Sequence, residues 1–132
     1  MELLIVMVII GILTAIAMPN YSEYIARGNR SDAKGQLLQV AQWLERVRTE
    51  GNSYIPAGGA VLPQGFATSP AGATAAAKKY DITAPVWTAT TYTLTAAPAN
   101  SMATDRCGTF QLDQTGLRSL PNGANMADCW GR

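Results

Sequence analysis

The chain has 132 residues, with ten Lys and Arg, nine Asp and Glu, and a formal net charge of +1. This length accommodates one modest domain with an appendage, and the near-neutral charge with scattered cations predicts no nucleic-acid partner. The absence of histidine removes the commonest general base and zinc ligand. Because paired carboxylates, a phosphate-binding glycine loop and a nucleophile motif are also missing, we assign no catalytic residue, cofactor or metal, and expect no enzyme.

An uncharged apolar run from Leu3 to Met18 dominates the N-terminal region, and Thr14 is its only polar side chain. As a helix the run would span about 24 Å, slightly less than the hydrocarbon core of a membrane. A cleavable secretory signal is the alternative, since Ala15-Ile16-Ala17 resembles a cleavage site. That alternative fits poorly, because Glu2 stands where a signal peptide needs a basic region.

Beyond Pro19 the sequence has the pattern of an amphipathic helix. Its apolar residues recur at intervals of three and four: Leu37, Val40, Ala41, Leu44 and Val47. We expect the charged residues of this stretch, Arg30 among them, to lie largely on other faces. Gly51-Asn52 predicts the helix end, with Gly51 in the left-handed conformation. A helix from Glu2 to Glu50 would be about 73 Å long, so its N-terminal half must project from a small globule.

The remainder of the chain predicts a long loop and then a small sheet. Ile55 to Lys79 is rich in Ala, Gly, Pro and Thr, which indicates a surface connection, with a short helical turn at 73–79. Runs of β-forming residues follow at 80–83, 91–96, 109–112 and 117–120, and Asp113 to Gly116 is a hairpin-turn candidate. They predict an antiparallel sheet of about three or four strands, packed on the amphipathic helix in an α+β fold. We expect four aromatic residues in the core: Trp43, Trp87, Tyr92 and Phe110.

The chain has two cysteines, Cys107 and Cys129, and neither belongs to a CxxC motif. An even count suits one disulfide in an oxidising compartment. The bridge would close a loop of about 23 residues and stabilise the fold by roughly 3 kcal/mol. That contribution is large for a core of this size.

The N-terminal stretch resembles the mature N-terminus of type IV pilins at five positions: Glu2, Gly11, Pro19, Tyr21 and Tyr24. YTLTAAP, DRCGTFQLDQTGLRS and the closing Cys129-Trp130 resemble the sheet and the disulfide-bounded region of PilE-like pilins. The resemblance implies the type IV pilin fold, a long N-terminal helix whose C-terminal half packs on a small antiparallel sheet. Residues 1–25 would form the projecting hydrophobic helix, and 26–132 the globular domain with a surface loop at 52–79.

This resemblance also implies a function. The protein would be a structural subunit of a type IV pilus, a helical homopolymer of identical subunits at the cell surface, serving adhesion, motility or DNA uptake. Before assembly it would reside in the inner membrane and depend on a prepilin peptidase and the pilus assembly machinery. The family pattern places a basic leader and an N-methylated aromatic residue before the glutamate, where Met1 stands here.

Roles for individual N-terminal residues follow from the same resemblance. Glu2 would meet the α-amino group of a neighbouring subunit, although an ordinary acid at a helix N-terminus is the alternative. Between Gly11 and Pro19 the family loses helical structure in assembled pili, and Thr14 would bond freed backbone groups; a simple proline kink is the alternative. Tyr21 and Tyr24 fit either a membrane interface or a contact between subunits.

Two other functions remain open. A pseudopilin of a type II secretion system would share the N-terminal motif and the α+β plan. Pseudopilins, however, often use a calcium site in the C-terminal region, where this chain has a cysteine pair and few acids. A membrane-anchored periplasmic binding domain, with the Ala/Gly-rich loop as its site, would remain a monomer in the membrane.

Overall fold

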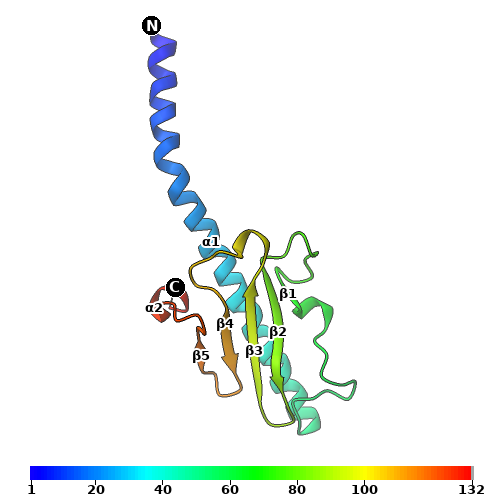
Figure 1. Cartoon of the computed structure of the whole chain (residues 1–132). Coiled ribbons are helices and arrows are strands. Elements are labelled where there is room, and N and C mark those ends of the chain that lie inside the picture. Colours follow the sequence, from blue (N-terminus) through cyan, green and yellow to red (C-terminus); the bar gives the residue numbers. More distant parts are fainter. Residues whose placement is uncertain (132) are drawn as a thin grey trace.

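A single long helix is the largest element of the molecule. The computed structural model describes residues 1–131, without the side chains of residues 19 and 20. Helix α1 runs without interruption from Glu2 to Gly51, and its 50 residues correspond to a length of about 75 Å. Its N-terminal half stands clear of the rest of the chain, and its C-terminal half lies against the sheet (Figure 1). The projecting helix predicted from length is therefore confirmed.

The C-terminal half of α1 supplies one wall of the core. Ala33, Leu37, Val40 and Leu44 are fully buried, at the spacing that the sequence pattern predicts for one helix face. At the end of α1, Asn52 and not Gly51 adopts the left-handed conformation, with φ 54°, and its N–H donates to the Arg48 carbonyl. The predicted helix end is thus correct to one residue. Asn52 can replace Gly51 in this role because asparagine is the non-glycine residue that best tolerates the left-handed conformation.

The other wall of the core is a five-stranded sheet in which every neighbouring pair is antiparallel. In space the strands follow their order along the chain: β1 (Thr68–Ser69), β2 (Tyr80–Trp87), β3 (Tyr92–Pro98), β4 (Phe110–Asp113) and β5 (Arg118–Ser119). The predicted α+β fold is confirmed, with β1 as an additional edge strand. A register shift between Thr83 and Val86 accommodates Pro85, which has no N–H for the ladder.

Short elements occupy the connections. The loop after α1 contains the 3₁₀ helix η1 (Gln64–Phe66) and strand β1, and a single helical turn lies within 73–79 as predicted, since the Lys78 N–H donates to the Thr74 carbonyl at 3.0 Å. A second 3₁₀ helix, η2 (Asn100–Met102), follows β3. Near the C-terminus, helix α2 (Met126–Cys129) is capped by the Asn125 side chain, which accepts from the N–H groups of Ala127 and Asp128.

Aromatic residues fill the space between α1 and the sheet. Tyr92 and Phe110 are buried as predicted, whereas Trp43 and Trp87 are only partly buried and pack at the rim. The predicted hairpin turn joins β4 to β5, with Gly116 at φ 82°. Asp113 fixes this turn, because its carboxylate accepts hydrogen bonds from the Thr115 and Leu117 N–H groups.

Candidate assembly site

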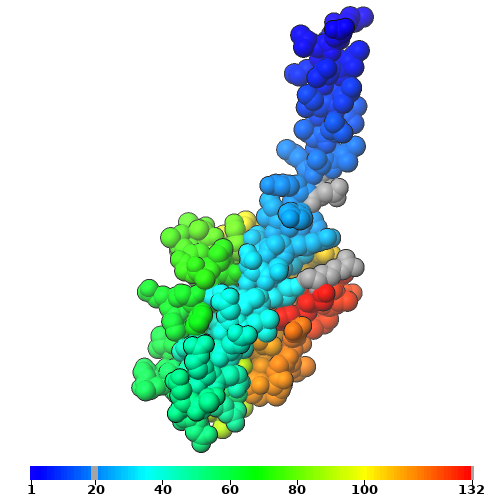
Figure 2. Space-filling view, turned by 180° about the vertical axis from the view of Figure 1, so that it is seen from behind, coloured from blue at the N-terminus to red at the C-terminus, as the bar shows by residue number. Residues whose placement is uncertain are grey.

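The projecting half of α1 exposes a continuous apolar surface. Every large apolar side chain from Leu3 to Met18 is at least 50% exposed, and Figure 2 shows no other segment against this part of the helix. By length and composition α1 is also apolar enough to cross a membrane. Burying a single Leu or Ile side chain stabilises a structure by about 2 kcal/mol, so this surface favours a lipid or protein environment over water.

Glu2 lies in the first turn of α1 and is exposed. Its position suits a carboxylate, because the positive end of the helix dipole attracts an acid there. No charged residue follows it until Glu23, so Glu2 has the one charged side chain on the projecting apolar segment. Transfer of this segment into a dry environment would leave that carboxylate in need of a positive partner.

The segment from Gly11 to Pro19 remains helical in the structure. The Thr14 hydroxyl lies 3.0 Å from the carbonyl oxygens of Ile10 and Gly11, a local bond typical of threonine within a helix. The loss of helix expected in assembled pili is not tested by a single subunit, so it stays a prediction, as does the role of Thr14 towards freed backbone groups. The alternative of a proline kink depends on the Pro19 ring, a side chain outside the described part of the structure.

Tyr21 and Tyr24 follow the apolar run at one-turn spacing. Their exposures are 66% and 74%, so neither ring belongs to the core of the subunit. Both rings remain available to a membrane interface or to another protein. The assembly roles of these residues stay predictions, as do those of Glu2 and Gly11.

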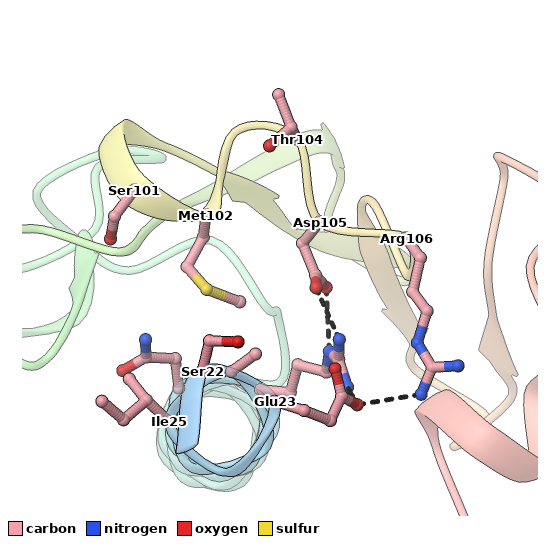
Figure 3. Close-up of a pocket in the computed structure, with 11 residues that line it drawn as sticks. Ser22, Glu23, Ile25, Ser101, Met102, Thr104, Asp105 and Arg106 are labelled. Atoms are coloured by element: carbon pink, nitrogen blue, oxygen red, sulfur yellow. Dashed lines mark hydrogen bonds and ion pairs between the residues drawn. The ribbon is translucent and has the colours of Figure 1, made fainter. Parts of the chain in front are cut away.

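A polar cluster anchors α1 at the point where it leaves the globule (Figure 3). Arg30 Nε donates to Asp105 Oδ2 at 2.9 Å, and Arg30 Nη1 donates to Glu23 Oε1 at 3.1 Å. Glu23 also accepts from Arg106 Nη2 at 3.0 Å. These residues line an open groove of about 430 Å³ between α1 and the loop after η2. The cluster joins residues 75 positions apart and attaches the loop after η2 to α1.

Electrostatics within the cluster follow from this geometry. The hydrogen bond from Arg30 lowers the pKa of Glu23, and attraction to Arg30, Arg106 and Arg27 acts in the same direction. Hydrogen bonds to Asp105 and Glu23 raise the pKa of Arg30, although burial opposes the increase. Arg30 is only 3% exposed, which corrects its predicted place on an exposed face. Its spacing from Ala33 and Leu37 puts it on the core face, a signal present in the sequence.

The disulfide predicted from the cysteine count is present. It joins Cys107, just before β4, to Cys129 at the end of α2, and both residues are buried. Trp130 follows immediately; its ring packs edge to face on Phe110, and its indole N–H donates to the Ser119 carbonyl. Together these contacts hold the C-terminal segment against the sheet and α1.

This combination defines a structural class. A long helix with an apolar projecting half, a C-terminal half packed on an antiparallel sheet, and a disulfide-bounded C-terminal region are the features of a type IV pilin. Residues 19–111 match the family described as "Type IV minor pilin ComP, DNA uptake sequence receptor", and the chain belongs to this family. Type IV pilins are structural proteins that assemble into pili with other pilins, and these pili lie outside the cell.

Individual relatives agree with this assignment. A fimbrial protein of Dichelobacter nodosus is 41% identical over 64 residues, which cover 46% of this chain and 40% of the relative. A type IV major fimbrial protein, FimA, of the same organism is 39% identical over an equal length. The chain therefore spans well under two thirds of the curated relatives that it matches.

Solved structures agree on the fold. A type IV pilin from Shewanella oneidensis superposes with a TM-score of 0.53 at 28% identity, covering 81% of this chain and 99% of that one. The non-core minor pilin PilV of Neisseria meningitidis gives the same TM-score at 17% identity, covering 77% of this chain and 98% of that one, which shows the fold alone.

Proposed function

We propose that this pilin polymerises through the projecting half of α1, which forms the core of a helical filament of identical subunits. The exposed apolar surface from Leu3 to Met18 carries this proposal. In the membrane, lipid covers that surface before assembly, and in the filament the helices of neighbouring subunits cover it. An inner-membrane pool, processing by a prepilin peptidase and dependence on the assembly machinery belong to the same proposal.

Glu2 has a specific part in the proposed assembly. A carboxylate that enters a dry bundle of helices loses hydration worth several kcal/mol, and this cost is not offset unless a positive group meets the carboxylate. The α-amino group of a neighbouring subunit is the partner of suitable charge and reach. Glu2 would then align each incoming subunit with the one before it, while the apolar residues provide cohesion.

The test replaces one carboxylate at a time. Glu2→Ala is expected to leave the amount of protein in the membrane unchanged and to remove most filaments from sheared surface material, as seen by electron microscopy and immunoblotting. Glu50→Ala is the matched control, because Glu50 is an exposed acid at the opposite end of α1. Filament yields of Glu2→Ala equal to those of Glu50→Ala would falsify the role of Glu2.

DNA capture is a second candidate function, and the family description supports it. It differs from the prediction made from composition, because a net charge of only +1 indicated no nucleic-acid partner. Fluorescence anisotropy of a labelled DNA duplex, titrated with the full chain in neutral detergent, tests it. Saturable binding that weakens steeply with salt is expected, and duplex that stays free at every protein concentration would exclude DNA capture.

The two alternatives drawn from sequence are now less favoured. The match to a type IV minor pilin family supports a pilus over a type II secretion pseudopilin. A calcium titration separates the two further, because strong thermal stabilisation by calcium would favour the pseudopilin. A periplasmic binding domain would produce no filaments containing this chain, so the same microscopy decides that alternative.

A further inference from the structure

The part of α1 that packs on the sheet has an outward face with two different flanks. Figure 2 shows this part of α1, in cyan, between the loop and β1 region, in green, on one side and the C-terminal segment and β4–β5 region, in red and orange, on the other. Each flank contains an open hollow, of about 350 Å³ beside β1 and about 260 Å³ beside the C-terminal segment. Ser31 and Gly35 line both hollows, so the two recesses lie on either side of the same turns of α1.

The flank beside β1 offers hydrogen-bond acceptors. Its hollow is lined by Ser69 and by three side chains that share one face of α1: Asp32, Gln36 and Gln39. Asp32 is exposed, and no cation in the described part of the chain forms a salt bridge with its carboxylate. The Gln36 side-chain N–H donates to the Gly65 carbonyl at 2.8 Å, which leaves the side-chain oxygen as an acceptor. This hollow therefore suits a cation with several N–H donors.

The flank beside the C-terminal segment presents such a cation. Arg118 is exposed, and its guanidinium carbon lies 5.3 Å from the centre of the Trp130 ring. That ring is fixed in turn by edge-to-face packing on Phe110 and by donation to the Ser119 carbonyl. Among the residues that the structure describes, no carboxylate forms a salt bridge with Arg118. A guanidinium stacked on an aromatic ring keeps its edge donors accessible, so Arg118 is oriented for an acceptor outside the subunit.

The proposed filament brings opposite flanks together. Parallel projecting helices around one axis relate each subunit to the next by the same rotation and rise. Such a contact is heterologous, so one flank of a subunit meets the other flank of its neighbour. Because α1 is one continuous helix with the sheet on one side only, its outward face turns toward that axis (Figure 1). The flank with Asp32 therefore meets the flank with Arg118, and their opposite charges attract.

From this arrangement we infer that Arg118 of one subunit binds in the hollow of the next, with its guanidinium on the Asp32 carboxylate and the Gln36 side-chain oxygen. The inference rests on the proposed polymerisation and adds a contact between globules to the contact between projecting helices. Apolar helices can rotate about one another with little change in buried area, because hydrophobic burial has no direction. A charged, forked hydrogen bond does have a direction, so this contact fixes the rotation from one subunit to the next.

Exchange of the two charges tests this contact. Asp32→Arg and Arg118→Asp are each expected to lower the filament yield in sheared surface material severalfold, with the amount of protein in the membrane unchanged. The double variant Asp32→Arg/Arg118→Asp restores opposite charges and is expected to recover most of the wild-type yield. Glu50→Arg and Arg46→Asp are the matched controls, because both residues are exposed charges of α1 outside the two hollows. Melting temperatures in neutral detergent verify that each variant is folded.

Each outcome has a definite consequence. Wild-type yields from either single reversal, or a double variant no better than the single ones, overturn this contact and leave polymerisation through α1 intact. Equal losses in Glu50→Arg and Arg46→Asp indicate a general charge effect and also overturn it. If a reversal lowers the melting temperature, Asp32→Asn or Arg118→Gln replaces it, and an unchanged filament yield again overturns the contact. Wild-type cells without filaments that contain this chain overturn the proposed polymerisation and this contact together.

Discussion

Arg30 carries a full positive charge on a side chain that is only 4% exposed, and the side chain of its partner Asp105 is 7% exposed. Desolvation of such a pair costs several kcal/mol, which the mutual attraction and the paired hydrogen bonds offset. The two residues come from α1 and from the loop before β4. The pair therefore positions that loop on the helix as well as contributing to stability.

Arg30→Met is expected to destabilise the protein by about 3 kcal/mol, since the buried Asp105 carboxylate would lose its partner. Urea unfolding of the full chain in neutral detergent, followed by tryptophan fluorescence, measures the change. Asp105→Asn in the Arg30→Met background is expected to recover part of the loss. Asparagine has no charge and retains an oxygen for the Cys107 N–H, which Asp105 accepts in the wild type.

A loss below about 1 kcal/mol in Arg30→Met would contradict this account and would mean that water reaches Asp105. Arg27→Met serves as the control for removal of a cation from the same helix. Arg27 pairs with Glu23 at 3.6 Å and is 58% exposed, so its replacement should change stability little.

At the scale of elements, the long helix and the four longer runs of β-forming residues could be predicted from the sequence. Both follow from the local spacing of apolar residues, which predicts an element wherever one of its faces is buried. Strand β1 and helix α2 could not be predicted, because Thr68–Ser69 and Met126–Cys129 are too short to show a period. Their existence depends on neighbours, β2 for the strand and the disulfide for the helix.

Local sequence likewise predicts some of the candidate functional residues and not others. The apolar segment from Leu3 to Met18 is contiguous, so composition alone identifies it. By contrast, Arg30 meets Asp105 across 75 positions, and Lys34 meets the Cys129 carbonyl across 95. A charge count describes these residues as scattered, and only the antiparallel sheet order and the disulfide bring them together. No local sequence pattern predicts contacts of that kind.

The disulfide-bounded segment from Cys107 to Cys129 depends on its bridge. Cys129→Ala is expected to lower the free energy of unfolding by about 3 kcal/mol, because the unfolded chain gains the freedom of an open loop. Thermal unfolding of the full chain with and without reductant measures the effect. Wild type should lose stability on reduction to about the level of Cys129→Ala, and the variant should not respond. Equal melting temperatures of the oxidised wild type and Cys129→Ala would rule out a stabilising role for the bridge.

At the scale of the whole molecule, the two halves of α1 face different environments. Residues 1–18 are all exposed in the subunit, whereas the C-terminal half of α1 buries Ala33, Leu37, Val40 and Leu44 against the sheet. One continuous helix would therefore transmit any force on the projecting segment directly into the globule. Separation of the two halves is expected to remove self-association without unfolding the globule.

A chain that begins at residue 26 tests this separation. It should be a soluble monomer with a single cooperative thermal transition, because every fully buried core residue lies beyond residue 26. The melting temperature should be slightly lower than that of the full chain in detergent, since Glu23 is lost while the Arg30 to Asp105 pair remains. Sedimentation velocity and near-ultraviolet circular dichroism measure the two properties. Aggregation of the shortened chain, or a broad transition without near-ultraviolet signal, would mean that the projecting helix is required for the fold as well as for assembly.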